Sequence, residues 1–405
     1  MTRNKKIDII GAMIVVGLIL SIGQTLVSFA DIPNIYVFMA TINRHGDFVY
    51  LNEIASRNSP YAAVLPDAGH FPFLFRIAHL FALMRLKYAV IAFYCLFIGF
   101  FLFYCYKGIS VRNAATDVTN ILLFSFGTYP FLFALNRGNY EMMVFILIAL
   151  FVWSYQCDMP LLGPVLLASA IAMKPFSAFF LLLFLSDRRF KDIVYVIVTT
   201  STATLLSYCS FEGGGGTNLR LHQASMDAYI TTYALNNTGL GYGSSLFGMV
   251  KIFIAYCSPE SLTQTTRAIF GSYSVLAVIV TCLVGSYMWV CEQTFWKKIA
   301  LIVFCMNLLP HVSADYRLLY VFIPLFLFIN SPHEDKHDLT YVVLFGLLLL
   351  PKYYYYFVFE SSANVVPYSV STSGILNPML MILCGGVIIT SGIRTHRKAR
   401  YPGAE

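Results

Sequence analysis

The feature that most constrains the fold of this chain is a series of apolar runs that recurs along its whole length. Ile7 to Ala30 is the first of them and Gly374 to Ile393 is the last. Hydrophobic residues make up 58% of the 405 residues and charged residues only 12%, so a soluble core could not hide this much apolar surface. The runs do not alternate between apolar and polar residues, which argues against an outer-membrane barrel. The sequence therefore predicts an all-α polytopic membrane protein.

Basic residues at the ends of the apolar runs set the predicted topology. The stretch Thr2 to Lys6 is basic and is expected to stay in the cytoplasm, so the first run, a retained signal anchor, leads outward. The runs Phe71 to Met84 and Ser244 to Cys257 are too short to cross a bilayer and are expected to be interfacial helices. About twelve spans remain, with both termini inside. They are Ile7 to Ala30, Tyr88 to Tyr106, Asp117 to Leu135, Glu141 to Gln156, Leu161 to Met173, Phe176 to Leu185, Ile193 to Cys209, Ile269 to Cys291, Ile299 to Leu309, Leu318 to Ile329, Tyr341 to Phe357 and Gly374 to Ile393.

Charge and cysteine spacing argue against several other classes of protein. The net charge of +7 comes from dispersed Lys and Arg residues at span ends, so nucleic acid is not an expected partner. The nine cysteines include no CxxC pair, so neither a disulfide framework nor a metal site is expected. We expect one integral membrane domain in two parts. The first part is residues 1–209, with an outer loop at 31–87, and the second is residues 210–405, with an outer loop at 210–245.

Titratable residues that are far apart in the sequence fall on the outer side of this topology. Within the stretch Thr41 to Leu80, directly after the first span, seven Asp, Glu, Arg and His residues lie from Arg44 to His70. Charges that only orient spans should favour the cytoplasm, whereas charges collected on the outer face from many helices indicate a site. The outer set comprises Asp47, Arg137, Lys174, Arg220, His222, His311, Asp315 and Arg317. The distribution predicts a functional site on the extracytoplasmic face.

An ordered set of short motifs resembles a known family of membrane enzymes. The motifs are Asp47-Phe48 with Tyr50, Asn58 to Tyr61, Phe71-Pro72, Asn136 to Asn139, Met173 to Pro175, and Asp187 to Arg189. Their order and spacing are similar to the glycosyltransferase C superfamily, in particular to glycosyltransferase family 87, the polyprenol-phosphate-mannose-dependent mannosyltransferases. The resemblance covers Ile7 to Cys209, and a weaker similarity covers Pro310 to Pro324. The chain departs from the family at Phe71-Pro72-Phe73, where a double proline is usual.

This resemblance implies a glycosyltransferase C fold whose first outer loop carries interfacial helices. It also implies an inverting transfer of a hexose, with mannose as the expected sugar, from a polyprenyl-phosphate donor to a hydroxyl of a lipid or glycan acceptor. The expected location is the outer face of a bacterial inner membrane. In the family an acidic residue of the first outer loop is the general base, and Asp47 matches that position. The lipid-linked sugar is a co-substrate, and no other cofactor is implied.

The residue chemistry is compatible with this activity. Inversion at an anomeric carbon needs one carboxylate to take the proton of the attacking hydroxyl, and Asp47 could supply it. The leaving phosphate needs cations and hydrogen-bond donors, for which the candidates are Arg137, Asn139, Lys174, His311 and Arg317. Weaker candidates for substrate binding are His45, Tyr50, Tyr61, Arg220 and His222. No metal is required if these groups converge.

Other interpretations stay open on the sequence alone. Asp47 could be an ordinary loop carboxylate, Arg137 and Asn139 could anchor helix ends at the headgroups, and Lys174 could reach to the interface. A lipid or solute transporter would also collect polar residues, although charges near mid-span and a symmetry between halves would then be expected. A polysaccharide polymerase or ligase would place its chemistry in the late outer loop, between Glu212 and Tyr242.

Overall fold

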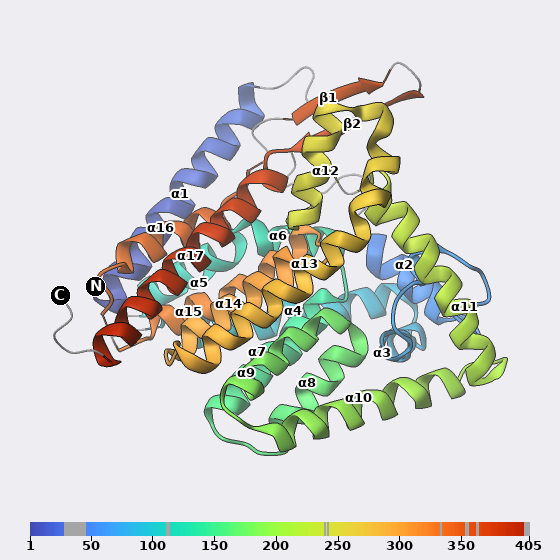
Figure 1. The fold of residues 1–405 in the computed structure, drawn as a ribbon, viewed down its shortest axis with the longest axis horizontal. Coiled ribbons are helices and arrows are strands. Elements are labelled where there is room, and N and C mark those ends of the chain that lie inside the picture. Colours follow the sequence, from blue (N-terminus) through green and yellow to red (C-terminus); the bar gives the residue numbers. More distant parts are fainter. Residues whose placement is uncertain are drawn as a thin grey trace.

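The computed structural model describes residues 1–27, 46–110, 114–238, 240, 243–332, 334–352, 356–361 and 364–400. In this part of the chain the helices pack around a large apolar core that includes Ile7 near one end of the sequence and Ile388 near the other, and a second, smaller apolar cluster includes Ile252 and Leu262 (Figure 1). The α-helices are α1 (Arg3–Val27), α2 (Gly46–Ala55), α3 (Pro72–Ala82), α4 (Leu86–Ile109), α5 (Ala114–Phe126), α6 (Tyr129–Arg137), α7 (Glu141–Gln156), α8 (Leu162–Met173), α9 (Leu181–Ser186), α10 (Phe190–Cys209), α11 (Gly214–Tyr229), α12 (Leu246–Cys257), α13 (Leu262–Val290), α14 (Phe295–Leu308), α15 (Phe322–Ile329), α16 (Asp338–Leu349) and α17 (Ser373–Arg400). Short 3-10 helices are η1 (Pro66–Ala68), η2 (Pro175–Phe180), η4 (Pro259–Ser261) and η5 (Asp315–Val321), and η3 (Ile230–Leu235) is a π-helix.

One β-hairpin accompanies the helices, which make up most of the described chain. Strands β1 (Tyr356–Ser361) and β2 (Asn364–Ser371) pair antiparallel, with Tyr356 opposite Ser371. A span was expected from Tyr341 to Phe357, but α16 ends at Leu349, and Pro351 follows, which cannot continue a helix. Both strands are rich in β-branched and aromatic residues, which favour extended backbone. The apolar run from Tyr341 to Phe357 therefore contains the end of a helix and the start of a strand, which hydropathy alone does not distinguish.

Membrane spans are present, although the expected number of twelve is not confirmed. Five helices among the described residues are long and apolar enough to cross a bilayer, or six if α5 and α6 form one bent span. The bend between α5 and α6 is 56°, and it falls at Gly127 and Thr128, just before Pro130 in the first turn of α6. The other apolar helices are shorter, at 10–17 residues. The chain is therefore a polytopic helical membrane protein.

Helix α4 shows how a span divides between core and lipid. Its buried residues include Ala89, Phe93, Phe97, Phe101 and Cys105, which recur at every fourth position and so form one stripe along the helix. Phe101 packs against Phe131 of α6 with ring centroids 4.5 Å apart. Large apolar residues on the other faces of α4 are exposed, which suits contact with lipid. The aromatic stripe therefore joins α4 to the first turn of α6.

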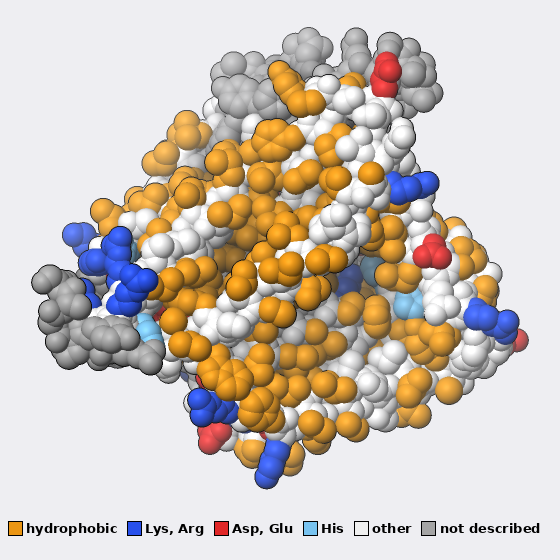
Figure 2. Space-filling model, viewed as in Figure 1, with side chains coloured by type: hydrophobic (Ala, Val, Ile, Leu, Met, Phe, Trp, Pro, Cys, Tyr) orange, Lys and Arg blue, Asp and Glu red, His pale blue; other side chains and the backbone are white. Residues whose placement is uncertain are grey.

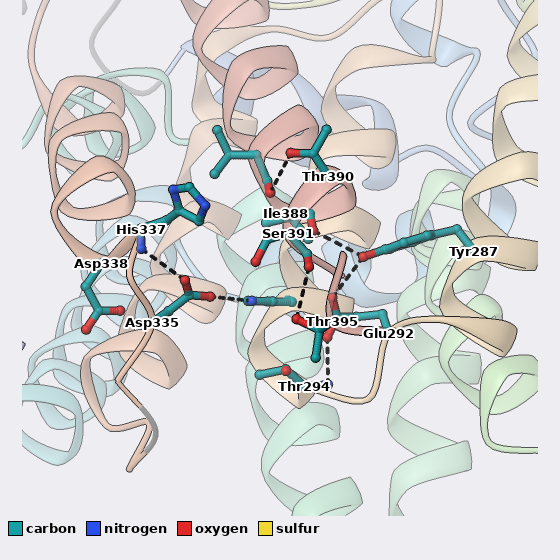
Figure 3. Close-up of polar contacts among 12 residues, drawn as sticks. Tyr287, Glu292, Thr294, Asp335, His337, Asp338, Ile388, Thr390, Ser391 and Thr395 are labelled. Carbon is teal, nitrogen blue, oxygen red and sulfur yellow. Dashed lines mark hydrogen bonds and ion pairs between the residues drawn. The ribbon is translucent and has the colours of Figure 1, made fainter. Parts of the chain in front are cut away.

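Polar contacts gather at one end of the bundle. Lys298, in the first turn of α14, lies 2.6 Å from Asp187, and the neighbouring Lys297 lies 2.6 Å from Asp335. Figure 3 shows this end, where Tyr287 donates hydrogen bonds to Glu292 and to the backbone of α17. These elements belong to the set predicted to face the cytoplasm. Helices α7 and α14 run from here to the opposite end, where the cavity described below lies.

The segment 210–245 is more ordered than the loop expected there. Helix α11 and the π-helix η3 occupy most of it, and α11 begins at Gly214. Gly213 and Gly214 have φ angles of +89° and +77°, a left-handed backbone that glycine adopts without a steric penalty. Gly213 and Gly214 therefore allow a tight turn between α10 and α11.

Candidate active site

A cavity of about 810 Å³ lies where several segments of the chain meet. Its walls come from α2, the η1–α3 junction, the α6–α7 junction, the α8–η2 junction, α11 with η3, α12, α13, and the segment from Pro310 to Arg317. Figure 2 shows a recess in which basic and histidine side chains lie among hydrophobic ones. Charged groups from distant parts of the sequence therefore share one space inside a largely apolar protein.

Asp47 lies in the first turn of α2 and faces two donors from the α6–α7 junction. The Arg137 guanidinium donates to Asp47 Oδ1 at 2.5 Å, and Asn139 Nδ2 donates to Oδ2 at 2.8 Å. Gly138 lies between these donors with a φ of +63°, which ends α6 and turns the chain into α7. Asn139 Oδ1 also accepts from the backbone N–H of Glu141 at 3.0 Å, so the amide is fixed on both sides. The Asp47 carboxylate is therefore held in one orientation at the cavity wall.

A second charged cluster is centred on Glu141, which was not among the candidate residues predicted from the sequence. Its side chain is fully buried, and its Oε1 lies 3.4 Å from Arg317 Nε and 3.9 Å from Lys174 Nζ. Tyr320 donates to Oε2 at 2.7 Å. The Arg317 guanidinium also stacks 3.8 Å from the ring of Phe176. A carboxylate at the start of an apolar helix, two residues after Asn139, is the signal that could have revealed this anchor.

His70 lines the cavity between η1 and α3 and was also not selected. Burial lowers the pKa of its imidazole well below the usual value, and the charges of Lys174 and Arg317 act in the same direction. The imidazole is therefore neutral at physiological pH and available as a hydrogen-bonding group. Its backbone carbonyl accepts from the Tyr61 hydroxyl at 2.8 Å, which ties the loop to a buried tyrosine.

The lowered pKa of His70 predicts a dependence of stability on pH. The unfolded chain binds a proton below a pH of about 6.5, whereas the folded protein does not, so the stability present above that value is lost as the pH falls. We expect a slope of at most about 1.4 kcal/mol per pH unit from this group. Thermal unfolding of the purified protein between roughly pH 5 and pH 8 measures it. The variant His70→Gln should have a flatter profile, and identical profiles would contradict the prediction.

The remaining wall of the cavity is formed by α12, α13 and the segment after α14. The His311 ring stacks on Phe270 with centroids 3.9 Å apart, and its Nε2 lies 3.3 Å from Ser274 Oγ. Lys251 lines the same wall. On the wall formed by η1 and η3, the Tyr233 hydroxyl donates to Asp67 at 2.8 Å. Of these residues, only His311 was a candidate from the sequence. The tertiary structure shows that the others lie at the cavity.

The structure brings most of the residues selected from sequence into this cavity. Those that line it are Asp47, Tyr50, Arg137, Asn139, Lys174, His311 and Arg317. Tyr61 and His222 are buried beside it but do not line it, because they pack on each other with ring centroids 4.9 Å apart. Arg220 is exposed on α11 and lies outside the lining. His45 falls outside the described residues.

Comparison with known proteins decides the family. The model of glycosyltransferase family 87 matches residues 71–310, which is more than half of the chain. The chain belongs to glycosyltransferase family 87. No curated protein and no solved structure matches it.

Membership makes this chain a membrane glycosyltransferase and confirms the resemblance found in the sequence. The residues matched to family 87 include Arg137, Asn139 and Lys174. Asp47 and Arg317 lie outside the matched segment, and the fold places them against Arg137 and Glu141. Charged residues inside and outside the matched segment therefore line one cavity.

Proposed function

We propose that this glycosyltransferase moves a hexose, with mannose as the expected sugar, from a polyprenyl-phosphate donor to a hydroxyl of a glycolipid or glycan. The transfer inverts the anomeric configuration, and Asp47 is the general base. The observation that carries the proposal is the position of an oriented carboxylate and several cations in one cavity of a membrane protein. The donor is a co-substrate, and the proposal needs no other cofactor and no metal.

The arrangement of Asp47 suits a general base. Among the described residues each carboxylate oxygen accepts one hydrogen bond, and a carboxylate has about four lone-pair sites, so room is left for an acceptor hydroxyl. The acceptor oxygen forms a bond to the anomeric carbon while its proton goes to Asp47. The bond from that carbon to the phosphate oxygen breaks, and the electron pair leaves with the lipid phosphate.

The leaving phosphate develops negative charge, for which the cavity supplies cations. Lys174 and Arg317 share Glu141 and both line the cavity, and Arg137 lies beside the base. Cations that are already positioned stabilise charge that appears only as the bond breaks. A guanidinium also matches the geometry of phosphate oxygens. His311 on the opposite wall is a further donor.

The surroundings of the cavity suit a lipid-linked donor at the extracytoplasmic face of a bacterial inner membrane. Phe270 of α13 lines the cavity, and only 11% of the apolar segment of α13 is buried, so lipid-facing surface adjoins the site. The basic ends of α1 and α14 gather at the other end of the bundle. Basic residues favour the cytoplasm, which supports an outward-facing cavity. The segment 210–245, the expected site of a polymerase or ligase, contributes Tyr229 and Tyr233 to this same cavity.

The experiment that tests the function is a transfer assay with purified protein in lipid nanodiscs. Labelled mannose and glucose would be offered as polyprenyl-phosphate sugars and, in parallel, as nucleotide sugars, together with a membrane lipid extract as acceptor. We expect a labelled product only from polyprenyl-phosphate donors, with the anomeric configuration inverted. Transfer from nucleotide sugars, retention of configuration, or no transfer from any donor would contradict the proposal.

A further inference from the structure

Lys251 differs from every other Lys or Arg that lines the cavity. Lys251 lies in α12 and is only 3% exposed. Its ammonium donates hydrogen bonds to the backbone carbonyls of Tyr233 at 3.1 Å and Thr238 at 3.4 Å. In the described part of the chain it forms no ion pair. Burying an ammonium without a compensating charge is costly, so such a group is expected where a ligand supplies the charge.

The other lining cations each have an acidic partner. Arg137 pairs with Asp47, and Lys174 and Arg317 share Glu141. Asp67 also lines the cavity, but its carboxylate accepts a hydrogen bond from the Tyr233 hydroxyl and is not within ion-pair distance of Lys251. The positive charge of Lys251 is therefore left uncompensated by the described protein groups around the cavity.

The start of α12 strengthens the positive character of this wall. Ser245 caps the helix by accepting from the Gly248 N–H at 2.9 Å, and both residues line the cavity. The amino-terminal end of a helix carries a partial positive charge. An ammonium has three donors, and the two carbonyl bonds leave one for a ligand.

We propose that Lys251 and the amino-terminal end of α12 bind an anionic group, a phosphate or carboxylate, carried by the acceptor. The proposal rests on the proposed function, because it assigns the cations Arg137, Lys174 and Arg317 to the phosphate of the donor. The two sets of groups line different walls of one cavity, Asp47 on α2 and Lys251 on α12. With its anion held at Lys251, the acceptor would be retained in the cavity that contains the base.

A specificity measurement tests the proposal. Phosphatidylglycerol and diacylglycerol both carry a free hydroxyl, but only the first carries a phosphate. With a polyprenyl-phosphate sugar as donor, we expect the wild type to prefer phosphatidylglycerol in kcat/KM by about tenfold or more, the value of one charged hydrogen bond. In Lys251→Gln that preference should fall toward one through a higher KM for phosphatidylglycerol, with the KM for the donor unchanged. Lys251→Arg should restore most of it.

A structural role for Lys251 gives a different result. If it only ties α12 to the backbone of Tyr233 and Thr238, Lys251→Gln should lower the melting temperature and leave the acceptor preference as in the wild type. That outcome overturns the proposal, as does a wild type with no preference between the two acceptors.

A binding measurement separates this proposal from the proposed function. Phosphatidic acid and diacylglycerol would be added to the purified protein in nanodiscs, and binding would be followed by the rise in melting temperature. We expect phosphatidic acid to stabilise the wild type more than Lys251→Gln. If the wild type transfers no sugar but this difference persists, the anion site stands and the proposed function fails. Equal stabilisation of the two proteins by phosphatidic acid overturns the anion site.

Discussion

Asp47→Asn is expected to reduce sugar transfer by about 100- to 10,000-fold, which is the range of a general base. Asn has nearly the same shape and retains one oxygen to accept from Arg137 or Asn139, but an amide cannot take the proton of the acceptor hydroxyl. The loss should therefore appear in kcat, with little change in the KM for the donor. The measurement is transfer of labelled sugar by equal amounts of folded protein in nanodiscs.

The matched control for this variant is Glu53→Gln on the same helix. The Glu53 side chain is 65% exposed, pairs with Arg57 at 3.3 Å, and does not line the cavity. We expect wild-type activity and an unchanged melting temperature, because exposed ion pairs contribute little to stability. If Asp47→Asn kept full activity, the base would have to be another group, and the mechanism proposed for this cavity would be wrong.

Glu141→Gln is expected to have the second largest effect, on stability and activity together. The carboxylate is fully buried and lies within ion-pair distance of Lys174 and Arg317, so the variant leaves two largely buried cations without their counter-charge. Removing one partner of a buried ion pair destabilises proteins by about 3–5 kcal/mol. The two cations would also lose their common anchor, so a lower kcat is expected in the fraction that remains folded. Thermal unfolding and the transfer assay measure the two effects.

Glu292 offers a control with similar burial and different partners. Glu292 is 3% exposed and lies at the other end of the bundle. Its carboxylate accepts hydrogen bonds from two neutral donors, the Tyr287 hydroxyl and the Thr294 N–H. Glu292→Gln should cost less stability and leave the activity per folded molecule unchanged. If Glu141→Gln matched the wild type in melting temperature and kinetics, Glu141 would not be the anchor of Lys174 and Arg317.

Hydropathy and short motifs were sufficient for several conclusions. The apolar runs predicted a polytopic helical membrane protein, and the motifs around Asp47, Arg137 and Lys174 predicted the family. Both are local properties of the chain, since a span depends on its own hydropathy and a motif on its own spacing. The count of spans could not be predicted in the same way, because helices such as α7 and α8 are apolar yet shorter than a bilayer is thick.

The tertiary structure alone decided which charged groups share the cavity. Asp47 and Arg137 are 90 positions apart, and Arg317 and Glu141 are 176 apart, so no local pattern could pair them. Arg220 and His222 were both weaker candidates in sequence, and packing left the first exposed and buried the second beside the cavity. Ion pairs form only within a few ångströms, and helix packing, which depends on side chains from the whole chain, sets those distances.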